Sequence, residues 1–229
     1  MEYGQFCPVS KAMELLGEKW TMLILREMHM GATRFSELQR GLTLISPTVL
    51  TKRLNDLCDA ELILRKKITG QRGYEYFLTQ AGKETLPMLK LVGEWGMRWA
   101  RGNMDDSELD VSLLMLYLQR SIKPEALPGN ESVIKFVFTD QQVLSDWWVM
   151  VNNGDVEICV DNPGREVDVY FTTDLRTMVE CWMGDRTYTS AISEKRLTLV
   201  GPKALTRNIK HWLADSLFAG IPPAKEIKV

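Results

Sequence analysis

The sequence predicts an α+β protein built from two domains. Its 229 residues are enough for two hydrophobic cores. The spacing of apolar residues is helical over most of the first half and changes to a period near 2 in several parts of the second half. Charge divides in the same way, because residues 1–101 carry 15 Lys and Arg against 11 Asp and Glu, whereas residues 102–229 carry 13 against 19. The net charge of −2 therefore combines a basic half and an acidic half.

The composition excludes several classes of protein. With 45% hydrophobic and 25% charged residues, the chain has the composition of a globular protein and not of a disordered or collagenous one. Its longest apolar runs, at residues 21–25 and 111–118, are far shorter than the roughly 20 residues that span a bilayer. The first residues contain no apolar secretory segment, so we expect a cytoplasmic location and no membrane partner. Four scattered cysteines without C-x-x-C spacing, together with two histidines, predict neither a disulfide framework nor a metal site, and we expect no cofactor.

The first domain, residues 1–102, begins with three predicted helices followed by a fourth with clear boundaries. Residues 9–30 fit two short helices that stop at Gly17 and Gly31, and residues 34–40 fit another that ends at Gly41. A longer helix follows over residues 47–59, where Ser46 is a natural N-cap and Pro47 occupies the first helical position.

The period then changes from 3.6 towards 2. Residues 64–69 and 74–78 form two predicted strands, and the Gly-Gln-Arg-Gly turn at residues 70–73 joins them as a hairpin. Thr79 caps a further helical stretch that ends near Arg101. Helices followed by such a hairpin have the order of a winged helix-turn-helix domain.

The second domain is predicted over residues 108–229, after a linker that begins at residue 102. A helix over 109–121 precedes four strand-like runs, VIKFVF, WWVMV, VEICV and EVDVYF, which we expect to form an antiparallel meander. Asp174 caps a helix that runs to Met183, and residues 188–193 and 196–201 fit a short helix and a strand. An amphipathic helix over residues 203–218 is expected to close the chain, giving an antiparallel sheet with helices.

One face of the predicted 47–59 helix has the chemistry of a recognition helix. If Leu50, Leu54 and Leu57 face the core, short polar and basic side chains lie on the opposite face. Thr and Asn can hydrogen-bond to base edges, and Lys can bind phosphate. A helix face that simply contacts solvent is the alternative. The candidate DNA-contacting residues here are Ser46, Thr48, Thr51, Lys52 and Asn55.

The hairpin after this helix is rich in cations. A charge cluster usually serves only solvation. Here, however, the cations directly follow the candidate recognition helix, where a winged-helix protein contacts phosphates or the minor groove. We therefore predict double-stranded DNA as a partner. The candidate residues are Arg65, Lys66, Lys67 and Arg72.

Several sequence blocks of the first domain resemble one bacterial family. CPVSKAMELLGEKWTMLILREM, RFSELQRGL, ISPTVLTKRLNDLCDAELI and YEYFLTQAGKETLPML occur in the order and spacing of the HxlR-type, MarR-related winged helix-turn-helix regulators. The resemblance covers about the first 100 residues. It implies a homodimer in which the helices at the start of the domain and after the wing form the interface, with each subunit contacting one half-site.

Cys7 is a candidate redox residue. It matches a cysteine before Pro-Val that some members of that family use to sense electrophiles or oxidants, and a nearby helix N-terminus and Lys11 would favour its thiolate. The alternative is a small apolar residue without redox chemistry.

Large apolar side chains are frequent in the second domain. They could line a cavity for a nonpolar ligand, or they could simply fill the core. Strand alternation allows only one of Trp147 and Trp148 to face inward. The candidate ligand-binding residues are Trp148, Met150, Met178, Trp182, Trp212 and Phe218.

The stretch from DVYFTTDL to KHWL resembles the sterol carrier protein fold. The shared pattern is a strand, a helix ending in W-x-G-D, a short helix, an L-x-L-x-G strand and a closing helix, and it covers about residues 108–220. This resemblance implies a hydrophobic small-molecule site between sheet and helices.

We find no enzyme motif: the chain lacks G-x-S-x-G, a P-loop, G-x-G-x-x-G and H-E-x-x-H. The sequence therefore predicts a non-enzymatic, homodimeric DNA-binding transcriptional regulator that a hydrophobic small molecule modulates. A hydrophobic-ligand carrier, in which the first domain serves for dimerisation, is the alternative.

Overall fold

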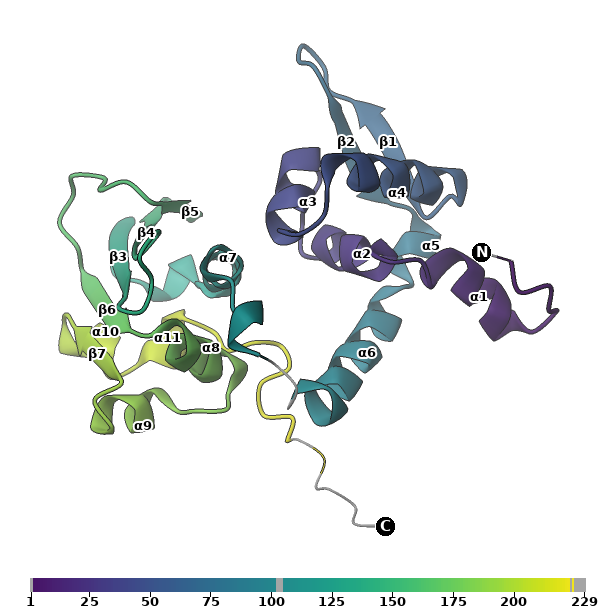
Figure 1. Cartoon of the computed structure of the whole chain (residues 1–229). Coiled ribbons are helices and arrows are strands. Elements are labelled where there is room, and N and C mark those ends of the chain that lie inside the picture. The colour runs from purple at the N-terminus through teal and green to yellow at the C-terminus, as the bar shows by residue number, and fades with distance from the viewer. Residues whose placement is uncertain (1, 102–104, 223, 225–229) are drawn as a thin grey trace. The chain divides into compact units, whose positions relative to one another are not determined.

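A computed structural model describes residues 2–101, 105–222 and 224 of the chain (Figure 1). The chain divides into two compact units, Met1–Trp95 and Gly96–Val229, and each is described by itself. The division falls within helix α6, several residues before the predicted linker. Residues 102–104 of that linker lie outside the described residues.

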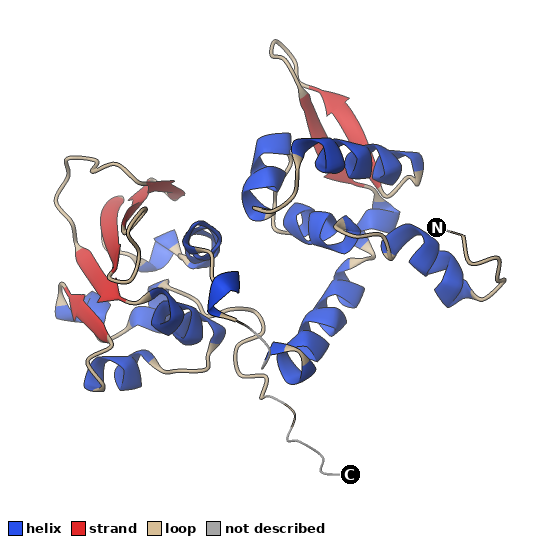
Figure 2. Ribbon diagram, in the orientation of Figure 1, coloured by secondary structure: helices blue, strands red, loops and turns tan. Residues whose placement is uncertain are grey.

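The first unit contains helices followed by a two-stranded ribbon, in the predicted order. Its helices are α1 (Pro8–Leu16), α2 (Thr21–His29), α3 (Phe35–Gly41), α4 (Pro47–Asp59), α5 (Gln80–Lys83) and α6 (Leu86–Trp99), the last of which extends into the second unit. The ribbon pairs β1 (Ile63–Lys67) with β2 (Tyr74–Leu78) antiparallel. Figure 2 shows this ribbon extending beyond the helices. The first four predicted helices and the hairpin are thus confirmed. The single helical stretch predicted from Thr79 to near Arg101 is wrong, because the structure divides it at residues 84–85 into α5 and α6, where Pro87 has no N–H to continue the helical bonding.

The core of the first unit fixes how α4 is rotated about its axis. Leu50, Leu54 and Leu57 are at most 3% exposed, and they belong to one cluster with Ile24 and Leu25 of α2. Burial of a leucine side chain contributes about 1.5–3 kcal/mol. Because these leucines recur at helical spacing, the opposite face of α4 is held towards solvent.

Gly41, at the end of α3, allows a buried carboxylate to lie against the helix. A Cβ atom at Gly41 would stand 2.0 Å from Oε2 of Glu27. The Glu27 side chain is fully buried, and its Oε1 pairs with Arg26 at 2.7 Å. The carboxylate therefore has little room to move, and this approach links α2 to the turn that precedes α4.

The second unit is a five-stranded sheet with helices on one face. Its strands are β3 (Glu131–Phe138), β4 (Asp146–Asn152), β5 (Asp155–Cys159), β6 (Val169–Thr173) and β7 (Leu197–Val200). Its helices are η2 (Asp106–Glu108), α7 (Val111–Ser121), η3 (Pro124–Ala126), α8 (Leu175–Met183), α9 (Tyr188–Ser193), α10 (Lys203–Thr206) and α11 (Ile209–Trp212). The core between them includes the stacked rings of Phe136 and Phe171, whose centroids are 4.6 Å apart.

The predicted antiparallel meander is wrong at its fourth strand. The strand order is β5-β4-β3-β6-β7, and β6 pairs with β3 in parallel, with Phe136 opposite Phe171. The remaining pairs are antiparallel. The connection from Val160 to Asp168 is nine residues long, which is too long for a tight hairpin, and it carries the chain from the β5 edge to the far side of β3. This placement buries both Val169 and Phe171 completely.

Strand alternation separates the two adjacent tryptophans, as predicted. Trp147 belongs to the core on the helix-covered face, and Trp148 lies on the other face. Trp148 is nevertheless only 6% exposed, and the Lys135 ammonium stands 4.7 Å from its ring centroid.

The predicted closing helix over residues 203–218 is also wrong, because the structure breaks it into α10 and α11. Asn208 leaves the helical conformation, with φ −120° and ψ 41°, and Leu213 is extended and forms an isolated bridge with Ile122. The amphipathic spacing is thus satisfied by two short helices and a segment that pairs with the end of α7.

Replacing Gly41 with alanine is expected to destabilise the first unit by about 1–3 kcal/mol, because the new methyl group would force the buried Glu27 carboxylate to move. Gly96→Ala is the matched control, since a Cβ at that helical position meets no atom within 4 Å. Urea unfolding followed by circular dichroism measures both variants. Equal unfolding midpoints for G41A and G96A would contradict the proposed constraint.

Candidate nucleic-acid interface

The solvent-facing side of α4 presents three predicted contact residues together. Thr48, Lys52 and Asn55 are all exposed and lie opposite the buried leucines. The spacing of three or four residues places them on one helix face. This face offers a hydroxyl, an ammonium and a carboxamide, which can hydrogen-bond to base edges and phosphates.

Two other predicted residues of this helix have local structural bonds. The Ser46 Oγ accepts a hydrogen bond from the backbone N–H of Val49 at 3.3 Å, and so it caps α4. The Thr51 hydroxyl donates to the Pro47 carbonyl at 2.9 Å. Both side chains are exposed, but these bonds orient them along the first turn of α4.

The ribbon distributes its predicted cations over two faces and a tip. Arg65 lies on the face that also carries Tyr74 and Tyr76, and its guanidinium stands 4.4 Å from the Tyr74 ring. Lys66 lies on the opposite face, where its ammonium is 5.1 Å from the Phe77 ring. These contacts support the long side chains without neutralising their charges.

Lys67 and Arg72 are exposed at the outer end of the ribbon. Arg72 lies in a turn between Gly70 and Gly73, whose φ angles of 74° and 115° favour glycine. Since glycines add no side chains beside Arg72, the turn can approach a nucleic-acid backbone closely.

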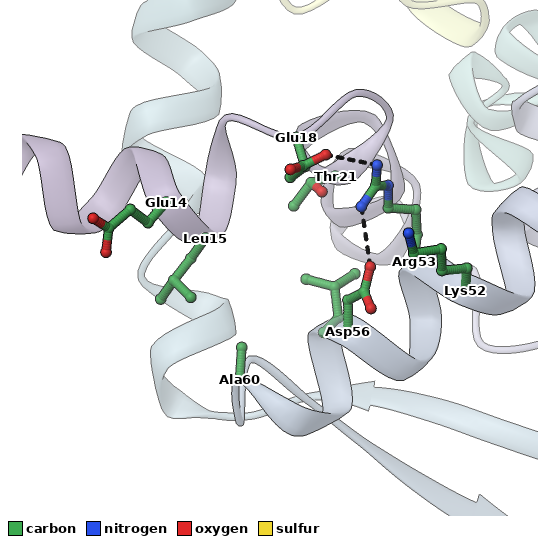
Figure 3. Close-up of a pocket in the computed structure, with 9 residues that line it drawn as sticks. Glu14, Leu15, Glu18, Thr21, Lys52, Arg53, Asp56 and Ala60 are labelled. Carbon is green, nitrogen blue, oxygen red and sulfur yellow. Dashed lines mark hydrogen bonds and ion pairs between the residues drawn. The ribbon is translucent and has the colours of Figure 1, made fainter. Parts of the chain in front are cut away.

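Arg53, which no pattern in the sequence indicated, attaches α4 to the chain before α2. Its guanidinium pairs with Glu18 at 2.7 Å and with Asp56 at 3.0 Å (Figure 3). Its Nε donates to the Lys19 carbonyl at 3.0 Å. The Arg53 side chain is only 15% exposed. Its partners at residues 18 and 19 are far away in the sequence, so no local spacing could have indicated them.

A cavity of about 310 Å³ lies beside this ion-pair cluster. Figure 3 shows Glu14 and Leu15 of α1 on one side of it and Lys52, Arg53 and Asp56 of α4 on the other, with Ala60 just after that helix. Buried Thr21 and Leu57 also line it. The lining charges are mostly paired, because Glu14 binds Lys11 at 2.9 Å and Arg53 binds both Glu18 and Asp56.

The cysteines differ in environment. Cys7 is exposed at the N-cap of α1, where the backbone N–H groups of Ser10 and Val9 lower the pKa of its thiol. Burial raises the pKa of Cys58, and it raises that of Cys181 to about 11. A redox role of Cys7 stays a prediction.

The structure does not gather the six predicted ligand-binding residues around one cavity. Met178 and Trp212 are at most 1% exposed in the core between sheet and helices. Trp148 and Met150 lie on the other face of the sheet, and Met150 lines a cavity of about 380 Å³ with Asp155 and Pro163. Trp182 and Phe218 are half-buried.

Within residues 2–101, 105–222 and 224, no group of three His, Cys, Asp or Glu side chains is placed to hold a metal ion. No helix in the same part of the chain has the length and apolarity needed to cross a membrane.

Comparison with known proteins gives the family. The model of the HxlR-like helix-turn-helix family matches residues 15–104. An uncharacterized HTH-type transcriptional regulator of Bacillus subtilis, YvaP, is 32% identical over 113 residues, which are 48% of this chain and 100% of that protein. The chain belongs to the HxlR-like helix-turn-helix family.

Other matches also fall in part of the chain. An uncharacterized HTH-type transcriptional regulator of Mycobacterium tuberculosis is 39% identical over 89 residues, which are 38% of this chain and 56% of that relative. The match thus spans little more than half of the mycobacterial protein. The solved structure of the reduced form of the transcriptional regulator YodB from Bacillus subtilis is 26% identical, covers 43% of this chain and 98% of that one, and has a TM-score of 0.38.

The cysteine environments predict an order of alkylation. As pH rises, Cys7 should react with iodoacetamide first, because its lowered pKa gives thiolate at the lowest pH, and Cys181 should react last. Peptide mass spectrometry over pH 6–10 measures this order, and protein unfolded in urea is the control in which the differences should vanish. Modification of Cys58 or Cys181 at lower pH than Cys7 would show that the order is wrong.

Proposed function

We propose that this chain is a DNA-binding transcriptional regulator in which α4 enters the major groove. The observation that carries the proposal is the exposed Thr48, Lys52 and Asn55 face of α4, held outward by the buried leucines opposite it. Membership of the HxlR-like family supports the same function. In this proposal Thr48 and Asn55 contact base edges, and Lys52 binds phosphate.

The ribbon would bind the DNA backbone beside this groove. Arg65, Lys67 and Arg72 supply charge along its length and at its tip, and Lys66 supplies it on the other face. Such contacts add affinity that depends on salt and not on sequence. Arg53 holds the Glu18–Lys19 segment against α4, so it would keep the groove-binding face in place without touching DNA.

The proposed regulator acts as a homodimer through α1 and α6. No residue of α1 is buried, and its Val9 and Met13 are 69% and 45% exposed. On α6, Leu91, Val92 and Trp95 are 65%, 59% and 62% exposed. Apolar helix faces of this kind are typical of protein interfaces. A dimer would place two α4 helices on two half-sites.

The proposed role of the second unit is to bind a hydrophobic small molecule that modulates DNA binding. The half-buried Trp182 and Phe218 support this role. The order of β6, α8, α9 and β7 also supports it, since it follows most of the pattern on which the resemblance to the sterol carrier fold rests, whereas the closing helix of that pattern is divided into α10 and α11. Ligand binding could change DNA affinity only by the difference between its affinities for the two states. In the alternative function, a hydrophobic-ligand carrier whose first domain serves for dimerisation, the ribbon cations would not contribute to binding the ligand.

Lys52→Ala and Arg72→Ala should each weaken binding to a DNA fragment from the protein's own promoter region. Each lost phosphate contact should make the negative slope of log affinity against log salt less steep by about 0.9. Fluorescence anisotropy at several salt concentrations measures affinity and slope, and Lys203→Ala, on α10 of the second unit, is the control. Unchanged affinity and slope in both K52A and R72A would contradict DNA binding and favour the carrier.

Leu91→Glu should convert the dimer to a monomer, because it places a charge in the proposed apolar interface. Light scattering after size-exclusion chromatography measures the mass, and Val143→Glu is the matched control, since Val143 is 77% exposed in a loop of the second unit. A wild-type chain that runs as a monomer, or an L91E variant that remains dimeric, would contradict this interface.

A further inference from the structure

Among the described residues of the second unit, two buried oxygen atoms have no hydrogen-bond partner. They are the hydroxyl of Tyr188, on α9, and Oδ1 of Asp215, which follows α11. Tyr188 is only 5% exposed, because its ring packs in the core of this unit. Leaving such a group unpaired lowers the folding equilibrium by about tenfold, so two of them in the second unit require an explanation.

Both atoms, here called the polar cluster, belong to residues placed near the C-terminal end of α8: Ser216, next to Asp215, donates to the Trp182 carbonyl, and Tyr188 begins α9 five residues after α8 ends at Met183. The pKa of Tyr188 is raised first by burial and then by the nearby Cys181 thiol and Asp215 carboxylate. The other oxygen of Asp215, Oδ2, already pairs with Lys210 at 2.5 Å. The charge of Asp215 is therefore balanced at its outer oxygen, while its inner oxygen still needs a donor.

An extended segment brings Asp215 to this place. The N–H of Ala214 donates to the Ser121 carbonyl at 2.9 Å, and the N–H of Ser216 donates to the Trp182 carbonyl at 2.8 Å. These bonds lay the segment over the C-terminal ends of α7 and α8. The break after α11, which the sequence did not predict, thus positions the carboxylate.

Apolar surface lies next to the polar cluster. The Trp182 ring stacks on Tyr117 with centroids 5.1 Å apart, and Trp182 is half-buried. Close by, Ala219 packs so tightly on Gly184 that a Cβ at Gly184 would stand 2.9 Å from the Ala219 Cβ. Met183 and Phe218 are also half-buried. A ligand that reaches the cluster would lie along aromatic and aliphatic groups.

The chemistry of the two atoms selects the ligand group. Ionised Asp215 can only accept a hydrogen bond, and Tyr188 can donate one. A hydroxyl group satisfies both, because it donates and accepts at one atom. A carboxylate would be repelled by Asp215, and a buried ammonium would lose its hydration next to a carboxylate that Lys210 already balances.

We infer that Tyr188 and Asp215 form the polar end of a small-molecule site in the second unit, and that they bind the hydroxyl group of an otherwise apolar ligand. The inference rests on the proposed effector role of this unit and names its ligand class. Trp182, Met183 and Phe218 would contact the apolar part of the ligand.

The test compares 1-hexanol with 1-methoxypentane, which has the same number of heavy atoms but no hydroxyl hydrogen. Thermal unfolding and calorimetric titration of the full chain measure binding. The alcohol should bind and raise the unfolding temperature relative to the ether, because the ether cannot donate to Asp215. Tyr188→Phe should weaken hexanol binding about fivefold. Tyr170→Phe, at an exposed tyrosine on the opposite face of the sheet, should leave it unchanged.

Stability without ligand gives a second, opposite signal. In the absence of hexanol, Y188F should be at least as stable as wild type, since the substitution removes an unpaired buried hydroxyl. Loss of stability in Y188F without ligand would overturn the inference in favour of an internal water that bridges the two oxygens. Equal effects of alcohol and ether, or tighter binding of n-hexylammonium than of hexanol, would also overturn it.

DNA anisotropy on the same wild-type protein separates this inference from the proposed function. If the chain fails to bind DNA but discriminates hexanol from the ether through Tyr188, the regulator proposal fails and the hydroxyl site stands. If DNA binding holds and the discrimination is absent, the hydroxyl site alone is overturned.

Discussion

Burial of three leucines on one side of α4 is the constraint on which the first unit depends. Leu50, Leu54 and Leu57 together contribute several kcal/mol, and they can be buried only in one rotation of the helix. That rotation decides which side chains contact solvent. Thr48, Lys52 and Asn55 form an exposed face because the opposite face is committed to the core, so the stability of the unit and its proposed DNA surface have the same origin.

The position of α4 depends on polar contacts as well as on the core. Glu27 lies against Gly41 at the end of α3, and Arg53 joins α4 to the Glu18–Lys19 segment. Both are charged groups that are nearly or fully withdrawn from water, and such groups are stable only when their partners are fixed. They therefore define a specific arrangement of α2, α3 and α4. Arg53 also lines the cavity between α1 and α4, next to Lys52 (Figure 3).

In the second unit, the apolar core and the unpaired polar groups occupy different places. Phe136, Phe171 and Trp212 fill the space between sheet and helices, where the sequence predicted a ligand cavity. The unpaired Tyr188 and Asp215 oxygens lie instead where α9 and the segment after α11 meet α8. Because a core at this density leaves little free volume, the polar end of the unit is the more suitable place for ligand recognition.

The sequence by itself determined the first four helices and the ribbon of the first unit, together with the composition of their exposed faces. Helical spacing, the Ser46 cap and the Gly70–Gly73 turn are local signals, so they predicted α4 and the ribbon without knowledge of the fold. The parallel pairing of β3 with β6, the break at Asn208 and the contacts of Arg53 were decided only by the tertiary structure. All three depend on contacts between segments that are distant in the chain. The free energy of such contacts comes from burial and ion pairing between segments, which produces no periodic pattern in the sequence.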